Sequence, residues 1–166
     1  FWIVLIVGTV ALLGACAKKE ESTTAASTSV TSTTASGSIT FGSETLSGTY
    51  VSPCYSNAEV AAAASAGYFP PDMLAMRDVL VVTSDTSISE ETHAYADATC
   101  STTSYYSKDG NTSFTVGVAS GDNYKVTYTE TTFKALTDTT DAESWWETLF
   151  SNNVDFTLGT EYSGSG

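Results

Sequence analysis

Alternation of apolar and polar side chains restricts the fold of this chain more than any other feature of its sequence. In the segment YKVTYTETTF (residues 124–133), Tyr124, Val126 and Tyr128 fall on one side of an extended strand, and the lysine and threonines between them fall on the other. A period of two is typical of antiparallel strands with one buried face and one exposed face. The sequence therefore predicts an antiparallel sheet.

Turn signals divide the chain from residue 44 onward into short strand-like segments. Ser84-Asp85, KDGN (residues 108–111) and ASGDN (residues 119–123) each combine residues that favour turns. Residues 154–159 are predicted to form one more strand. About six or seven strands, with turns roughly every 8–12 residues, predict an all-β domain that is either a small antiparallel barrel or a sandwich.

Two short helices are expected to interrupt the strands. Ser56 and Glu59 have the spacing of a capping box, and the alanine-rich residues 57–66 that follow are predicted to be helical. A second capping pattern begins at Thr140 and opens the segment DAESWWETLF (residues 141–150). Its aromatic residues are spaced four apart, so this helix should lay them against the sheet.

The chain begins with an uncharged apolar run, FWIVLIVGTVALLGACA (residues 1–17). It is shorter than the roughly 20 residues that a membrane-spanning helix needs, and it has the length of the apolar part of a secretory signal. Its end, Leu13-Gly14-Ala15-Cys16, resembles the lipobox of bacterial lipoproteins, in which an aliphatic residue and two small residues precede a cysteine. An uncleaved single-pass anchor is the alternative.

The lipobox resemblance implies that residues 1–15 are a signal peptide and that Cys16 carries the lipid. It also implies a location in the bacterial cell envelope, outside the cytoplasm. Ala17, rather than an aspartate, follows the cysteine, which in a Gram-negative cell favours the outer membrane. Because no methionine or basic segment precedes Phe1, and the chain ends in SGSG, we expect it to be truncated at its start and allow for the same at its end.

A linker is expected between the lipid and the domain, so that residues 16–42 form a lipidated cysteine and a disordered tether. From Ser22 to Thr40, 13 of 19 residues are serine or threonine. Such a composition buries too little apolar surface to offset the entropy lost on ordering. The β domain is then expected to occupy residues 43–166.

The cysteine count predicts a disulfide bond. The chain has three cysteines, Cys16, Cys54 and Cys100, and lipid on the first leaves an even pair. In an oxidising compartment outside the cytoplasm, such a pair is expected to be bonded. A zinc site would need about four ligands, so no metal and no cofactor is predicted.

Charge and motif content argue against several classes of function. With 19 acidic and 6 basic residues, the chain lacks the basic surface that nucleic acids require. At strand spacing, Glu91, His93, Tyr95 and Asp97 share one face, with Glu90 beside them, and could form a metal or acid–base cluster. Since His93 is the only histidine, a solvent-facing row is the preferred interpretation. No catalytic residue is predicted, and the chain is not expected to be an enzyme.

A second resemblance concerns the ligand. Gly48-Thr49-Tyr50 resembles the Gly-x-Trp signature of lipocalin-type barrels, and together with Cys54 and YADATC (residues 95–100) it is similar to small lipocalin-like bacterial lipoproteins of unassigned function. The hypothesis is a monomeric, tethered, non-enzymatic β domain that binds a partner or a small apolar or glycan ligand, through residues that the sequence does not identify. A structural module without a ligand site is the alternative, and an envelope hydrolase has the least support.

Overall fold

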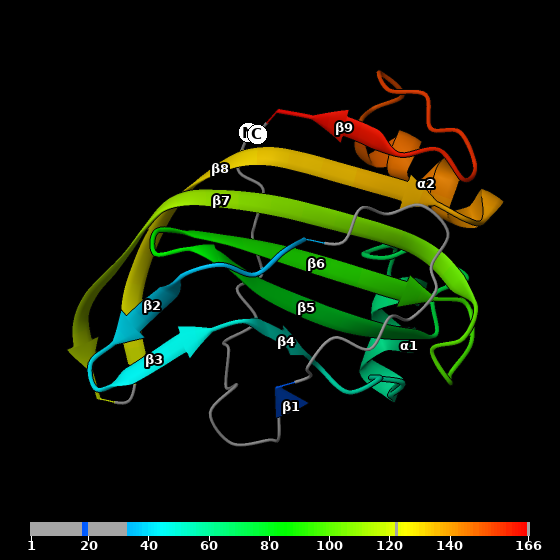
Figure 1. Cartoon of the computed structure of the whole chain (residues 1–166). Coiled ribbons are helices and arrows are strands. Elements are labelled where there is room, and N and C mark those ends of the chain that lie inside the picture. The colour runs from blue at the N-terminus through cyan, green and yellow to red at the C-terminus, as the bar shows by residue number, and fades with distance from the viewer. Residues whose placement is uncertain (1–17, 20–32, 122, 166) are drawn as a thin grey trace.

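The computed structural model describes residues 18–19, 33–121 and 123–165, and in these residues the fold is all-β with two short helices. The main sheet has seven strands in the order β1-β4-β5-β6-β7-β8-β9, and all neighbouring strands are antiparallel (Figure 1). Its strands are β1 (Lys18–Lys19), β4 (Thr49–Val51), β5 (Ala75–Ser84), β6 (Ser87–Tyr95), β7 (Thr103–Ser120), β8 (Asn123–Thr137) and β9 (Tyr162–Gly164). The predicted antiparallel all-β class is therefore confirmed.

The main sheet remains open in the described part of the chain. Its strand order ends at β1 on one edge and at β9 on the other, and these two strands do not pair. A separate hairpin of β2 (Ser38–Phe41) and β3 (Glu44–Ser47) forms a second, two-stranded sheet. Of the two predicted architectures, the sandwich-like one is correct and the closed lipocalin-like barrel is not.

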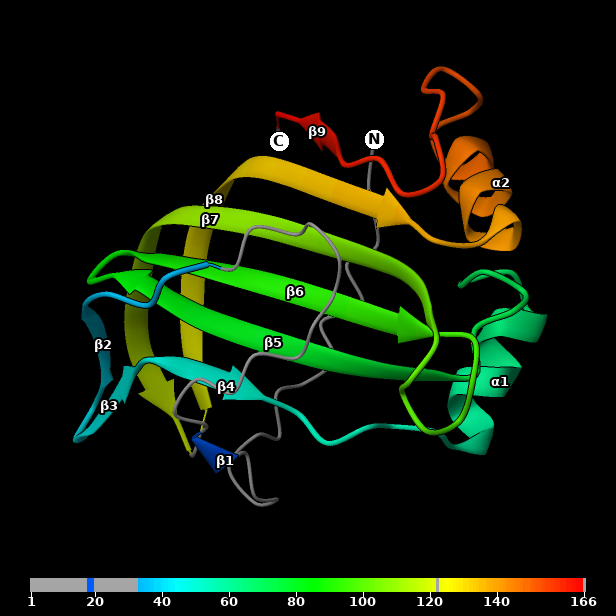
Figure 2. The same cartoon turned by 45° about the vertical axis from the view of Figure 1, so that its right-hand side comes forward.

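Strong curvature of β7 and β8 gives the main sheet an inner and an outer face. The pairing register of these long strands shifts at Gly110/Asn111, at Thr112/Thr115 and at Val116/Ala119. Such bulges bend a strand and increase its twist. Figures 1 and 2 show the far halves of β7 and β8 turning away from the plane of β5 and β6, toward the β2–β3 hairpin.

Two separate apolar clusters cover the two ends of the inner face. The first joins the two helices to the sheet, and its buried residues are Val60, Ala64, Met73, Ala94, Tyr105, Ala135, Ala142, Trp146 and Phe156. The second joins the β2–β3 hairpin to the curved strands, and its buried residues are Ile39, Val82, Ile88 and Phe114. The middle of the inner face, between the clusters, therefore lies outside both.

The helices form where the sequence predicts them, but each cap is one residue away from its predicted position. Asn57, rather than Ser56, caps α1 (Ala58–Ser65), and its side chain accepts hydrogen bonds from two backbone N–H groups of the first turn. The Thr139 side chain likewise caps α2 (Thr140–Leu149). In the part of the chain described here, neither helix is long and apolar enough to cross a membrane.

Two predictions of local structure are wrong. KDGN (residues 108–111) is not a turn but lies within β7, because β6 pairs with it on one side and β8 on the other, which satisfies its backbone hydrogen-bonding groups in the sheet. Residues 154–159 are not a strand; they carry Phe156 into the first apolar cluster, and the strand β9 follows them.

The expected tether is shorter than the sequence indicates. Residues 38–41 form β2, in which Ile39 is only 4% exposed, and Lys18–Lys19 pairs with Tyr50 and Val51 of β4. Burial of one isoleucine and a complete hairpin ladder outweigh the polar composition of the last linker residues. Residues 1–15, predicted to be a signal peptide, and Cys16 lie outside the described residues.

Limited proteolysis tests the remaining tether. An elastase-type protease, which accepts small residues, is expected to cut first between residues 20 and 32, because that segment is rich in serine, threonine and alanine. Mass spectrometry should then show a resistant fragment beginning near Thr33, upstream of β2. First cuts within β7 or β8 would contradict this prediction.

Candidate functional site

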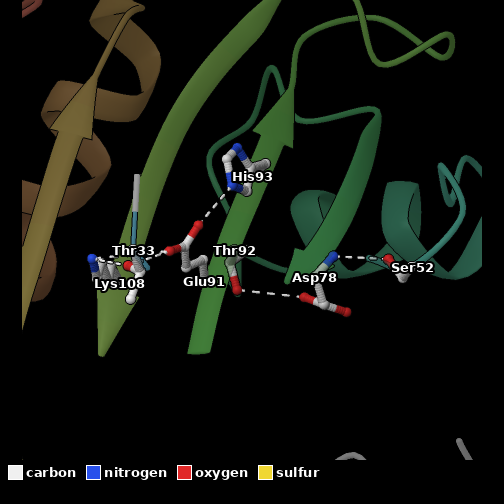
Figure 3. Close-up of polar contacts among 7 residues, drawn as sticks. All are labelled: Thr33, Ser52, Asp78, Glu91, Thr92, His93 and Lys108. Atoms are coloured by element: carbon white, nitrogen blue, oxygen red, sulfur yellow. Dashed lines mark hydrogen bonds and ion pairs between the residues drawn. The ribbon is translucent and has the colours of Figure 1, made fainter. Parts of the chain in front are cut away.

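The predicted histidine row lies on the outer face of the sheet and forms a closed polar network (Figure 3). Glu91 accepts hydrogen bonds from Thr33 Oγ1 at 3.0 Å and from His93 Nε2 at 3.3 Å. The ammonium group of Lys108 lies 3.9 Å from the same carboxylate and also donates to Thr33. Burial alone would raise the pKa of Glu91, but the hydrogen bonds from His93 and Thr33 outweigh it and lower the pKa. The network fastens the segment at Thr33 to the sheet.

Asp97 does not join this row. Its carboxylate accepts hydrogen bonds from the backbone N–H groups of Thr99, Ser101 and Thr102 at the end of β6. The hydrogen bond from the Thr99 hydroxyl is the main cause that lowers the pKa of Asp97. Asp97 therefore shapes a loop, in which Cys100 adopts a left-handed backbone conformation with φ of 55°. Among the residues that the structure describes, no three His, Cys, Asp or Glu side chains form a group that could hold a metal ion.

The inner face carries a different cluster, which we call the acidic row. Four consecutive strands each contribute one carboxylate to it: Asp78 from β5, Glu90 from β6, Asp109 from β7 and Glu130 from β8. Glu90 and Asp109 are direct cross-strand partners. Like charges placed opposite each other destabilise a sheet, so this arrangement opposes the stability of the fold.

No lysine or arginine side chain of the same strands lies on the face that carries these charges. In a strand, successive side chains point to opposite faces. The basic residues of β5, β7 and β8 occupy the alternate positions and therefore face outward; they are Arg77, Lys108, Lys125 and Lys134. The four carboxylates of the acidic row thus lie on the inner face, whereas these basic residues lie on the outer face together with Glu91.

The pKa values reflect this crowding. Desolvation is the main cause that raises the pKa of Asp109 to about 6, and the charges of Glu130 and Glu90 raise it further. Desolvation also raises the pKa of Glu90, with Asp78 and Glu130 adding to the effect. These carboxylates gain more from a nearby positive charge than ordinary surface carboxylates do.

Asn111 lies at the centre of this arrangement. It is 2% exposed and is the cross-strand partner of Glu130. Its side-chain Nδ2 donates to Glu90 Oε2 at 3.5 Å, while its Oδ1 has no hydrogen-bond partner among the described residues. Leaving a buried amide oxygen without a donor costs about 1–3 kcal/mol. The acidic row therefore lies next to a buried hydrogen-bond acceptor, Asn111 Oδ1, that has no donor.

Aromatic side chains flank the acidic row. The rings of Phe114 and Tyr128 stack with centroids 6.2 Å apart, at the boundary with the second apolar cluster. Phe133, the cross-strand partner of Asp109, packs against the first cluster. Thr92 adds a hydroxyl that donates to Asp78 at 3.5 Å (Figure 3). The middle of the inner face is thus polar, and the two apolar clusters lie on either side of it.

A change of pH tests the acidic row. The proton on folded Asp109 is released near pH 6, whereas in the unfolded chain it is released near the ordinary value of 3.8. The folded state therefore binds more protons between these values, so this group makes stability fall as pH rises through that window. Asp109→Asn should stabilise the chain at about pH 7 and change little at about pH 3.5, as measured by urea denaturation.

Asp155→Asn provides the matched control, because Asp155 is an exposed carboxylate outside the acidic row. It removes the same formal charge and should leave stability nearly unchanged at both pH values. An equal effect from both variants would assign the result to the overall negative charge of the chain instead.

Sequence reasoning found Glu90 only as a neighbour of His93 and missed the other members of the acidic row. Tyr105 and Tyr106 are both buried, and as successive residues of β7 they face opposite sides of the sheet. Tyr128 of β8 lies two residues from Glu130 and therefore beside the acidic row. Each of the four strands has one acidic residue on its inner face, and only the strand register shows that these residues lie together.

The predicted disulfide between Cys54 and Cys100 is present, with 6.0 Å between the two Cα atoms. It joins the segment that follows β4 to the loop that follows β6, beside the inner-face helix α1.

Comparisons with protein-family models, with curated proteins and with solved structures found no match to this chain.

Proposed function

We propose that this chain is a lipid-anchored protein of the bacterial cell envelope, outside the cytoplasm, whose inner sheet face binds a small ligand. The sequence Leu13-Gly14-Ala15-Cys16 supports the anchor. The Cys54–Cys100 disulfide supports export, since such bonds persist in oxidising compartments.

The unused side-chain oxygen of Asn111 is the observation that carries the ligand-binding proposal. Buried polar atoms usually have a hydrogen-bond partner. Seven buried side-chain atoms of the described residues have none, and of these Asn111 Oδ1 lies beside the acidic row. It lies among crowded carboxylates, three of which, Asp78, Glu90 and Glu130, are exposed. A purely structural module would gain stability by replacing some of these carboxylates with neutral side chains, which would relieve their repulsion.

Lipidation is tested by Cys16→Ser. This change removes the thiol that would carry the lipid, so labelling with radioactive palmitate should be lost and the chain should leave the membrane fraction. Ala17→Ser, which adds a hydroxyl one residue later, should keep both properties. Persistent labelling of the serine variant would show that the apolar run is an ordinary anchor.

Ligand binding is tested by thermal denaturation of the full chain with separate panels of amines, sugars, amino acids and fatty acids. A ligand of the inner face should raise the melting temperature of the wild-type chain and have a much smaller effect on Glu90→Gln/Asp109→Asn. Both substitutions keep the shape of the side chain. If every stabilising compound acted equally on this variant, the inner face would not be the binding site.

A further inference from the structure

We infer that the acidic row binds a linear polyamine, an alkyl chain carrying two or more ammonium groups; this inference rests on the proposed ligand-binding function. The row presents negative charge along a line, an amide acceptor at its base and aromatic rings at its borders. Each of these features selects one part of such a ligand.

The spacing of the carboxylates favours several separate positive charges. One carboxylate comes from each of four neighbouring strands, β5 to β8. Adjacent strands lie about 4.8 Å apart, so the row extends over roughly 14 Å across the sheet. It runs diagonally, because Asp78 is opposite Thr92 and Glu130 is opposite Asn111, each two residues away from the Glu90–Asp109 pair. A linear chain of ammonium groups joined by short alkyl spacers can follow such a diagonal row, so that different ammonium groups reach different carboxylates.

The same spacing disfavours a divalent metal ion as the ligand. A metal site needs several oxygen atoms that converge on one point, and no group of acidic, histidine or cysteine side chains meets this condition in the described part of the chain. An ammonium group donates separate hydrogen bonds in different directions. One ammonium group can therefore donate to the unpartnered Oδ1 of Asn111 and also to a carboxylate oxygen, for example of Glu90.

The borders of the row suit the alkyl part of the ligand. Tyr128 is 37% exposed and stacks on Phe114, so its ring offers apolar surface next to Glu130 on the same strand. Methylene groups gain free energy when they leave water for such surfaces. The face of a tyrosine ring also attracts an ammonium group.

The unpaired negative charge of the inner face also favours a ligand with several positive charges. The inner positions of β5 to β8 hold carboxylates without a basic partner, while the basic residues of these strands face outward. The raised pKa of Asp109 shows that its negative charge is unfavourable in the free protein. A bound polycation would remove this penalty, so binding and stability should increase together.

Titration calorimetry of the full chain with spermidine tests the inference. The wild-type chain should bind spermidine, and Glu90→Gln/Asp109→Asn should weaken binding by about tenfold or more, because hydrogen bonds to charged groups are among the strong ones. Urea denaturation of the same variant should show that it is folded, since both substitutions relieve repulsion.

A second double variant controls for the overall negative charge of the chain. Glu44→Gln/Asp155→Asn removes two exposed carboxylates outside the acidic row, and it should change the spermidine affinity by less than about twofold. Equal weakening by both double variants would overturn the inference, because binding would then be diffuse attraction to an acidic protein. Magnesium chloride at the same concentration should not displace spermidine, and full displacement would also overturn it.

Failure of this inference is distinguishable from failure of the proposed function. If spermidine does not bind while a sugar, amino acid or fatty acid stabilises the wild-type chain more than Glu90→Gln/Asp109→Asn, the inner face binds a ligand but not a polyamine. If no compound distinguishes the two proteins, both proposals are wrong.

Discussion

Replacing Trp146 with alanine is expected to lower the free energy of unfolding by about 3–5 kcal/mol, the usual cost of removing a buried tryptophan. Trp146 is 7% exposed, and its ring is the centre of the first apolar cluster. It contacts Phe133 of the sheet at 5.3 Å, Tyr105 at 5.6 Å and Phe156 at 5.9 Å between ring centroids. No smaller side chain can fill the space between α2 and the sheet.

The neighbouring tryptophan supplies the control for this experiment. Trp145 is only partly buried and donates a hydrogen bond from its indole N–H to the Gly67 carbonyl at 3.0 Å. Trp145→Ala should cost clearly less, since less apolar surface is lost. Urea denaturation measures both midpoints, and a larger loss for Trp145→Ala would show that the first apolar cluster does not depend on Trp146.

The packing of α2 illustrates what could be predicted from the sequence. The four-residue spacing of the aromatic residues at 145–150 predicts a helix that lays aromatics on the sheet, and Trp146 and Phe150 do pack there, with centroids 6.0 Å apart. The alternation at Tyr124 and Val126 likewise predicts the strand and its buried side, since both contact the second apolar cluster or its neighbours. Periodicity succeeds where one face of an element is buried along its length.

Local signals failed where tertiary pairing overrode them. The segment KDGN, at residues 108–111, has the residues of a hairpin turn, but two neighbouring strands offer it partners on both sides and so hold it extended. The caps show a smaller error of the same kind. Ser56 and Asn57 are both good N-caps, and in the structure it is the Asn57 side chain that accepts from the N–H groups of Glu59 and Val60.

The acidic row could not be predicted for a related reason. Its members lie between residues 78 and 130, and only the register of β5 to β8 brings them onto one face. Asp109 was moreover hidden inside the predicted turn, where a carboxylate is ordinary. The histidine row on the outer face could be predicted, because Glu91 and His93 are two residues apart on a single strand.

Loss of the Cys54–Cys100 disulfide is expected to have an effect as large as the loss of Trp146. The bond spans 46 residues. In the chain-entropy model, closing a loop of this length destabilises the unfolded state by about 4 kcal/mol. The bond also ties the segment after β4 to the loop that holds Cys100, and it therefore restrains the short strand β4 near one edge of the sheet.

Two experiments distinguish the effect of the disulfide bond from the effect of the two cysteine side chains. Cys54→Ala/Cys100→Ala should unfold at a lower urea concentration than the wild-type chain, and a reducing agent should lower the midpoint of the wild-type chain alone. Mass spectrometry of the unreduced protein should find no free thiol at either position. If the double variant and the wild type unfolded together, the loop would already be restrained without the bond. In that case Asp97, whose carboxylate accepts the backbone N–H groups of Thr99, Ser101 and Thr102, would be the group that holds it.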